Sequence, residues 1–303
     1  MGGGRVGFVD RRQMMAALAG AAQEPVFRVD VRLVRILATV RDAQGALAGG
    51  LAREDFVVTD NGVEQEIAVF ERQSAQPLSV AVLIDRSRST QRERAYELTA
   101  LRRFFRALVR EGNAGDAAAL YSFNFEVVLQ ADFTRRLDQL ERALRRLRSE
   151  GATAMYDAIY LASRDLERRD GRRVAVVVSD GADTISKTGF HEALEALHRA
   201  DAVLYALLLV PVKGEAGRNL RGENALIQFC SGTGGKMFYP AAPAALDEAF
   251  GEILRDLRTQ YLIGYYPKNV PPSRERFHRV RVRVKREGYT VSARTGYFAD
   301  AIP

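Results

Sequence analysis

The chain has 303 residues, of which 47% are hydrophobic and 27% charged, and its formal net charge is +7. This composition is that of a soluble globular protein, long enough for one large domain or two ordinary ones. The excess positive charge comes from arginines that are dispersed along the chain beside glutamates. It indicates solvated helix surfaces and does not favour nucleic-acid binding.

Cysteine and histidine are too few for a disulfide framework or a zinc site. Cys230 is the single cysteine, so no intramolecular disulfide can form. It lies among apolar residues, and we expect a buried structural thiol. The three histidines have no metal-ligand spacing with it, which argues against zinc. No segment after the N-terminal region is long and apolar enough to span a membrane.

Residues 1–25 are expected to be a leader. Arg11 and Arg12 precede the short apolar stretch QMMAALAGAA, which ends in small residues. This is the layout of an export signal, and the paired arginines also suit the twin-arginine route. An ordinary leader is the alternative, because the apolar part is short and contains Gly20. The layout favours export to the periplasm, the envelope or the medium, and a cytoplasmic location stays open.

Residues 26–76 show the period-two pattern of β-strands. Apolar residues alternate from Val26 to Arg41, with a slip near Leu33 that suggests a bulge or a strand that changes faces. The run DFVVTDNGVEQEIAVFE then predicts a hairpin that turns at Asn61-Gly62. These strands are too few to enclose a core by themselves.

Between residues 77 and 258, strands alternate with amphipathic helices. Buried strands are expected at 78–84 and in the segments DAAALYSFNF, RRVAVVVSD and AVLYALLLV, with helices between them. Several of these strands are apolar throughout, as are strands that are covered on both faces. The pattern predicts an α/β fold with a doubly wound, mostly parallel sheet.

Residues 259–303 return to a strand pattern. Val280, Val282 and Val284 alternate with basic residues, which is typical of a half-buried antiparallel strand. Neither terminal group has enough strands to be stable alone. We therefore expect the two groups to form one small antiparallel β-sandwich, with the α/β domain inserted between its halves.

Oxygen-bearing side chains follow the ends of two buried strands and one loop. Asp85 and Asp180 each come directly after an apolar strand, so both are expected at the carboxyl edge of the sheet, where open α/β sheets bind ligands. Ser87 and Ser89 follow Asp85 at alternate positions, and Thr153 precedes a helix. Such oxygen ligands suit a hard divalent cation that keeps one of its coordination positions open for water or a partner. Because the hydroxyls are neutral, the cation can attract a carboxylate from outside.

The segments DRSRST, GAT and SDGADT match, in order, the metal-ion-dependent adhesion site of von Willebrand factor type A domains, which the central part of the chain resembles. The flanks are similar to a VWFA-related family first noted in acidobacteria, whose members are mostly uncharacterised and exported. The resemblance implies that Ser87, Ser89 and Thr153 contact the metal directly. Asp85 and Asp180 would act largely through water. A partner's carboxylate would complete the coordination of Mg2+, or of Mn2+ or Ca2+.

Two features depart from the pattern of that family. Arg86 and Arg88 fill the variable positions of the Asp-x-Ser-x-Ser motif, where small residues are usual, and Ser179 stands where threonine is common. We expect the arginines either to narrow access to the metal or to recruit an acidic partner. Three further polar residues near these loops are expected to cap helices and to support the site by hydrogen bonds: Asp157, Asp183 and Thr184.

Three functions are compatible with these residues. The leading hypothesis is a non-catalytic module that binds an acidic group of a protein partner through a divalent cation. The second is a magnesium-dependent phosphohydrolase with Asp85 as nucleophile. Enzymes of the haloacid dehalogenase type, however, need a second acid two residues later, where this chain has Ser87. The third is a structural envelope protein with a vestigial metal site, in which the sandwich binds the partner.

Overall fold

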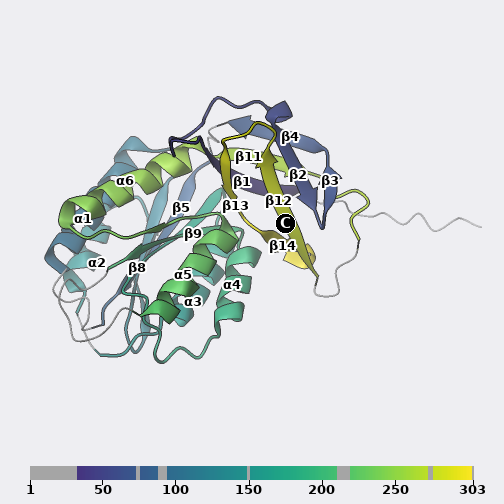
Figure 1. Cartoon of the computed structure of the whole chain (residues 1–303). Helices are drawn as coiled ribbons and strands as arrows, with labels where there is room; N and C mark the ends of the chain where they lie inside the picture. The colour runs from purple at the N-terminus through teal and green to yellow at the C-terminus, as the bar shows by residue number, and fades with distance from the viewer. Residues whose placement is uncertain are drawn as a thin grey trace, which may run out of the picture. The chain divides into compact units, whose positions relative to one another are not determined.

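The computed structural model of the chain describes residues 33–72, 76–87, 94–148, 151–209, 219–271 and 276–301. Figure 1 shows the arrangement of the elements. The strands are β1 (Val34–Arg41), β2 (Phe56–Asp60), β3 (Val63–Gln65), β4 (Ile67–Arg72), β5 (Leu78–Asp85), β6 (Ala117–Phe123), β7 (Val127–Thr134), β8 (Arg172–Ser179), β9 (Ala202–Leu208), β10 (Met237–Phe238), β11 (Tyr261–Tyr265), β12 (Phe277–Val284), β13 (Thr290–Ala293) and β14 (Gly296–Phe298). The helices are α1 (Arg94–Glu111), α2 (Leu137–Arg146), α3 (Met155–Glu167), α4 (Phe190–Arg199), α5 (Leu220–Thr233) and α6 (Pro243–Thr259).

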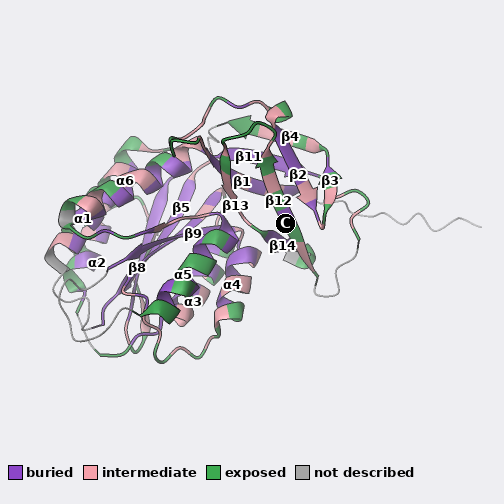
Figure 2. Ribbon diagram, in the orientation of Figure 1, coloured by how far each residue is buried: buried purple, intermediate pink, exposed green. Residues whose placement is uncertain are grey.

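The central sheet has six strands in the order β10-β9-β8-β5-β6-β7. Its strands are parallel except for β7, which pairs with β6 in the antiparallel sense at one edge. Every residue of β5 is buried, because one face packs against α1, α2 and α6 and the other against α3, α4 and α5. Figure 2 shows the buried strands between helices that are exposed on their outer sides. The predicted doubly wound α/β fold is therefore confirmed.

Strands from both ends of the chain form two antiparallel sheets, in the orders β13-β1-β11-β4 and β14-β12-β2-β3. Each sheet mixes strands that precede the α/β region with strands that follow it, as expected for a sandwich with an insertion. Their inner faces share one apolar core, to which Ile36, Tyr261 and Tyr265 contribute. The buried carboxylate of Asp60 in β2 accepts hydrogen bonds from Tyr265 of the other sheet and from Tyr297.

The terminal strands differ in detail from the sequence prediction. The turn at Asn61 and Gly62 is confirmed, with φ of 46° and 86°. The predicted hairpin nevertheless ends at β3, and the chain crosses to the other sheet as β4. At the crossing, the buried side chain of Gln65 accepts a hydrogen bond from the backbone N–H of Lys268 and donates one to its carbonyl oxygen. Gln65 still pairs with Val58 of β2 and is the last residue of β3, so the second run of the predicted hairpin is divided just after it.

The segment YTVSARTGYF is divided in the same way, into β13 and β14. Between them, Arg294 forms an ion pair with Asp201 at 2.8 Å, and the N–H of Thr295 donates to the carbonyl of Gly232. Both partners belong to the α/β region, which therefore holds the chain where it changes sheets. The expected leader at residues 1–25 and the slip near Leu33 fall wholly or largely outside the described residues.

Further contacts join the sandwich to the α/β region. Arg41 at the end of β1 pairs with Glu252 and Asp256 of α6, at 2.8 and 2.6 Å. The side chain of Gln260, which links α6 to β11, donates to the hydroxyl of Thr39 at 3.2 Å. Within the described residues, no helix is long and apolar enough to cross a membrane.

Candidate functional site

The carboxyl ends of β5 and β8 bring the predicted acidic residues to one edge of the sheet. The two strands are parallel neighbours, with Ile84 opposite Val178. Asp85 is therefore level with Ser179, and Asp180 follows it. The Asp85 side chain is fully buried. Its Oδ1 accepts a hydrogen bond from the N–H of Ser87 at 2.8 Å, and its Oδ2 accepts one from the hydroxyl of Ser179 at 2.6 Å.

Two acidic side chains set the electrostatics of this edge. Burial raises the pKa of Asp85 to about 6, the hydrogen bond from Ser179 opposes this rise, and the negative charge of Asp180 adds to it. A buried carboxylate next to a second carboxylate is destabilised when both are ionised. A cation close to both would remove this penalty.

The loop after β8 has a fixed geometry. Gly181 has a φ of 83°, and its N–H donates to the hydroxyl of Ser179, while the N–H of Ala182 donates to Oδ1 of Asp180. The start of α5 packs directly on this turn. A Cβ on Gly222 would lie 1.7 Å from the carbonyl oxygen of Gly181. Two glycines are thus required where these two backbones meet.

Thr153 is joined to the same loop. Its N–H donates to the hydroxyl of Thr184 at 2.9 Å, and its carbonyl accepts from the backbone N–H groups of Thr184 and Ile185. Asp183 accepts from the N–H of Tyr156 in the first turn of α3. These bonds place the predicted GAT segment beside the loop that carries Asp180.

The supporting residues form hydrogen bonds between α3 and the loop after β8, whereas the N-cap of α3 is Ala154 and not one of them. The carboxylate of Asp157 accepts hydrogen bonds from the backbone N–H groups of Lys187 and Thr188, and the hydroxyl of Ser186 donates to Asp183. The α3 helix is therefore fastened to the loop after β8. Within the described part of the chain, no three His, Cys, Asp or Glu side chains gather as a metal-binding group. Any cation here would depend on hydroxyl ligands in addition to two carboxylates.

The side chain of Arg86 is buried in the α/β region. Its side chain is 1% exposed, with Nη1 3.9 Å from Oε2 of the buried Glu97 in α1. Its backbone N–H donates to the carbonyl of Phe123 in β6. The expectation that Arg86 recruits an acidic partner is wrong, because the guanidinium is inside the protein. Ser89 and Arg88 lie outside the described residues.

Sequence reasoning missed three apolar side chains at this edge. Phe125, Ile185 and Leu220 are 52%, 44% and 63% exposed. Phe125 follows the carboxyl end of β6, Ile185 lies in the loop after β8, and Leu220 begins α5. The only signal in the sequence is that a large apolar residue interrupts an otherwise polar connection. Exposed apolar groups around a polar centre are typical of binding surfaces.

A cavity lies beside these loops. It has a volume of about 650 Å3, and its lining includes Tyr156 and Asp183 near the site and Arg221, Asn224 and Gln228 of α5. One wall is therefore shared with the loop after β8, and the other is a polar helix face.

Residues 80–182 match the von Willebrand factor type A domain family. The chain contains a von Willebrand factor type A domain. The match includes Asp85, Ser87, Thr153 and Asp180, so the residues at the sheet edge belong to this A domain.

The fold of the A domain has relatives among solved structures. A von Willebrand factor type A protein from Catenulispora acidiphila is 14% identical, with a TM-score of 0.50, over 90% of this chain and 76% of that chain. The vWF domain of the type V pili tip protein Mfa5 from Porphyromonas gingivalis is 14% identical, with a TM-score of 0.49, over 59% of this chain and 94% of that domain. An aerotolerance-related membrane protein from Bacteroides fragilis is 18% identical, with a TM-score of 0.45, over 59% of this chain and 98% of that chain.

No curated protein sequence matches the chain. The alignment with the Catenulispora acidiphila protein covers 90% of this chain, which is more than the A domain alone. The likeness in fold therefore takes in part of the flanking sandwich.

Proposed function

We propose that the A domain binds a protein partner through a divalent cation, Mg2+ or a similar ion, and that an acidic group of the partner completes the coordination. The observation that carries this proposal is that Asp85 and Asp180 lie at the carboxyl ends of adjacent parallel strands, where burial and, to a lesser degree, the charge of Asp180 raise the pKa of Asp85. The proposed ligands are Asp85, Ser87, Ser89, Thr153 and Asp180.

The donor chemistry supports a hard cation. Carboxylate and hydroxyl oxygens are the ligands that Mg2+ and Ca2+ prefer. Ser87 and Thr153 are both buried. The backbone N–H of Ser87 donates to the carboxylate of Asp85, and the backbone N–H of Thr153 donates to the hydroxyl of Thr184. Neutral hydroxyls leave part of the ion's charge uncompensated. This charge would attract an anionic side chain from a partner.

The surroundings favour a protein over a small anion as the partner. Phe125, Ile185 and Leu220 present apolar surface at the edge where the acidic residues lie. A free carboxylate compound would leave this surface uncovered, whereas a protein surface would cover it. The cavity with Arg221 in its lining offers a second, polar contact region.

Binding accounts for the site better than hydrolysis does. Von Willebrand factor type A domains are in general non-catalytic interaction modules. Both oxygens of Asp85 accept hydrogen bonds, which would weaken the carboxylate as a nucleophile, and Ser87 stands where a phosphohydrolase needs an acid. On the layout of residues 1–25, we place the protein in the cell envelope or outside the cell.

Thermal unfolding with Mg2+, Mn2+ and Ca2+ tests the proposal directly. A cation at a concentration of 100 times its Kd stabilises the folded protein by about 2.7 kcal/mol. We expect such a rise in the wild type, its loss in Asp85→Ala, and its retention in the control Asp138→Ala, which alters an exposed carboxylate of α2. Capture of a partner from the envelope fraction should be abolished by a chelator. A wild type that does not respond to any of the three ions excludes the proposed function.

A further inference from the structure

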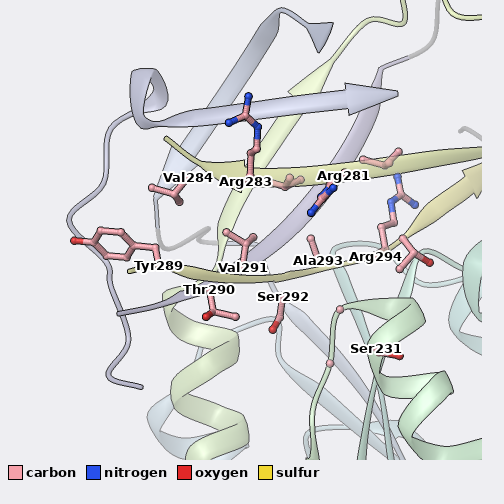
Figure 3. A pocket seen from close by; sticks show the side chains of 15 residues that line it. Ser231, Arg281, Arg283, Val284, Tyr289, Thr290, Val291, Ser292, Ala293 and Arg294 are labelled. Atoms are coloured by element: carbon pink, nitrogen blue, oxygen red, sulfur yellow. The ribbon is translucent and has the colours of Figure 1, made fainter. Parts of the chain in front are cut away.

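β12 and β13 are the two arms of one hairpin, but they belong to different sheets. β12 pairs with β14 only at Phe277–Arg279, and from Val280 to Val284 its paired neighbour is β2. β13 pairs with β1. The space beside Val280–Val284, in line with β14, is a cavity of about 520 Å3 that is walled by β12, by β13 and by the C-terminal end of α5. We call it the seam; Figure 3 shows its lining.

The backbone of β12 presents hydrogen-bonding groups to the seam. The carbonyl of Arg279 and the N–H of Lys285 bond to the β2 side, with Asn61 and Asp55. Because successive residues of a strand alternate in direction, Val282 and Val284 direct their N–H and C=O groups to the opposite side. The N–H of Val280 already bonds there, to the carbonyl of Thr295. Beyond it, no described strand pairs with this edge of β12.

The interior of the seam is apolar. Val282, Val284, Tyr289, Val291 and Ala293 are partly buried and pack against the sandwich core. In Figure 3, Val291 and Ala293 point from β13 toward β12, whereas Thr290 and Ser292 point away. The core of the sandwich is therefore incompletely covered along this line.

The rim of the seam is positively charged. Arg281 and Arg283 line it and are exposed. No described carboxylate forms an ion pair with either arginine, whereas Arg294 is held by Asp201. The two free arginines stand at alternate positions of β12, about 7 Å apart along the strand. Acidic side chains at alternate positions of an added strand have the same spacing.

We propose that the seam binds an extended acidic segment of a partner protein, which adds as a strand beside Val280–Val284 of β12. The main chain of the segment would bond the free edge of β12. Its apolar residues would enter the seam, and the Asp or Glu residues between them would face Arg281 and Arg283. This site is separate from the proposed cation site, and binding here requires no metal.

Fluorescence anisotropy with labelled peptides of about eight residues, the length of an ordinary strand, tests the seam. The measurement uses the full chain with a chelator present. A peptide of alternating valine and aspartate should bind, and one of alternating valine and lysine should bind roughly tenfold or more weakly. N-methylation of alternate amides along one edge of the acidic peptide should abolish binding, and along the other edge should not. Equal binding of the acidic and basic peptides, or no binding of the acidic one, overturns the proposal.

A pair of charge-reversed variants locates the site. The double variant Arg281→Glu, Arg283→Glu should bind the acidic peptide about tenfold or more weakly than the wild type does. The control is Arg110→Glu with Arg146→Glu, which makes the same change in charge at exposed helix positions of the A domain. If the control weakens binding equally, the peptide responds to net charge alone and the seam is not its site.

Discussion

The hydroxyl of Ser179 donates a 2.6 Å hydrogen bond to Oδ2 of Asp85, across the adjacent strands β8 and β5. The hydroxyl oxygen of Ser179 also accepts a hydrogen bond from the N–H of Gly181, the residue after Asp180. One buried hydroxyl thus orients the first carboxylate of the candidate site and fixes the loop of the second.

Ser179→Ala should destabilise the protein by about 1–3 kcal/mol, because the N–H of Gly181 loses its acceptor. The bond from Ser179 lowers the pKa of Asp85, so its loss should raise that pKa and weaken cation binding. Denaturant unfolding and calorimetric titration with Mg2+ measure the two effects. Ser179→Thr keeps the hydroxyl and is the control. Wild-type behaviour of the alanine variant would show that the hydroxyl does not organise the site.

Gly222→Ala should reduce both stability and cation affinity. The new Cβ would lie 1.7 Å from the carbonyl oxygen of Gly181, so either α5 or the loop after β8 has to move. The control is Gly251→Ala in α6, where the nearest atom is the flexible end of Arg255 at 3.3 Å. That substitution should stabilise its helix by up to about 1 kcal/mol. Similar changes in Tm for the two variants would contradict the close packing described above.

Asp60→Ala should be among the most damaging changes in the sandwich. Its buried carboxylate accepts the hydroxyls of Tyr265 at 2.8 Å and Tyr297 at 2.7 Å. Removing it leaves both donors buried without an acceptor, which costs about 2–5 kcal/mol. Tyr297→Phe removes one donor and should cost about 1 kcal/mol. Chemical denaturation checks both values, with Thr59→Ala, a change in the neighbouring residue of β2, as control.

His198 should make the protein less stable in mild acid. Burial and, to a lesser degree, the charge of Arg294 lower the pKa of His198 from 6.5 to about 4. Above pH 6.5 neither state is protonated. Between pH 6.5 and about 4 only the unfolded chain takes up the proton, so stability falls as the pH falls, by about 3 kcal/mol in all.

The contribution of this histidine is isolated by comparing the wild type with His198→Gln. The difference in unfolding free energy between them should change over that pH range and be constant above it. Other groups titrate in both proteins and cancel in the difference. A difference that is independent of pH from 7 to 4 would show that the imidazole is protonated equally in both states.

The sequence predicted the fold because the hydrophobic periods are long and distinct. The apolar run before Asp85 indicated a strand covered on both faces, and β5 is buried at every position. The alternation at Val280, Val282 and Val284 identified a half-buried strand. An alternation of apolar and polar residues, however, shows only which face of a strand is buried. It does not show to which sheet the strand belongs. The crossings at Gln65 and Arg294 depend on partners far along the chain, and no local pattern reveals them.

The positions of the site residues at the strand ends were predictable from the sequence, but the contacts between them were not. The two strand ends placed Asp85 and Asp180 at one edge, since parallel neighbours end on the same side. The contact of Ser179 with Asp85 depends on register between the strands, which sequence does not give. The burial of Arg86 was not predictable, because a motif in a loop carries no information about the helix that packs against it. Its guanidinium lies against the buried Glu97 of α1.

Pairing of β1 with β11 has a consequence for biosynthesis. Leu37 lies opposite Leu262, and the two described strands that pair with β1, β11 and β13, both follow the A domain in the chain. The edges of the strands before the A domain therefore stay unpaired while that domain is synthesised, and unpaired strand edges promote misassembly. Closure of the sandwich therefore follows synthesis of the A domain, and a chaperone that shields residues 34–72 until then should raise the yield of folded protein.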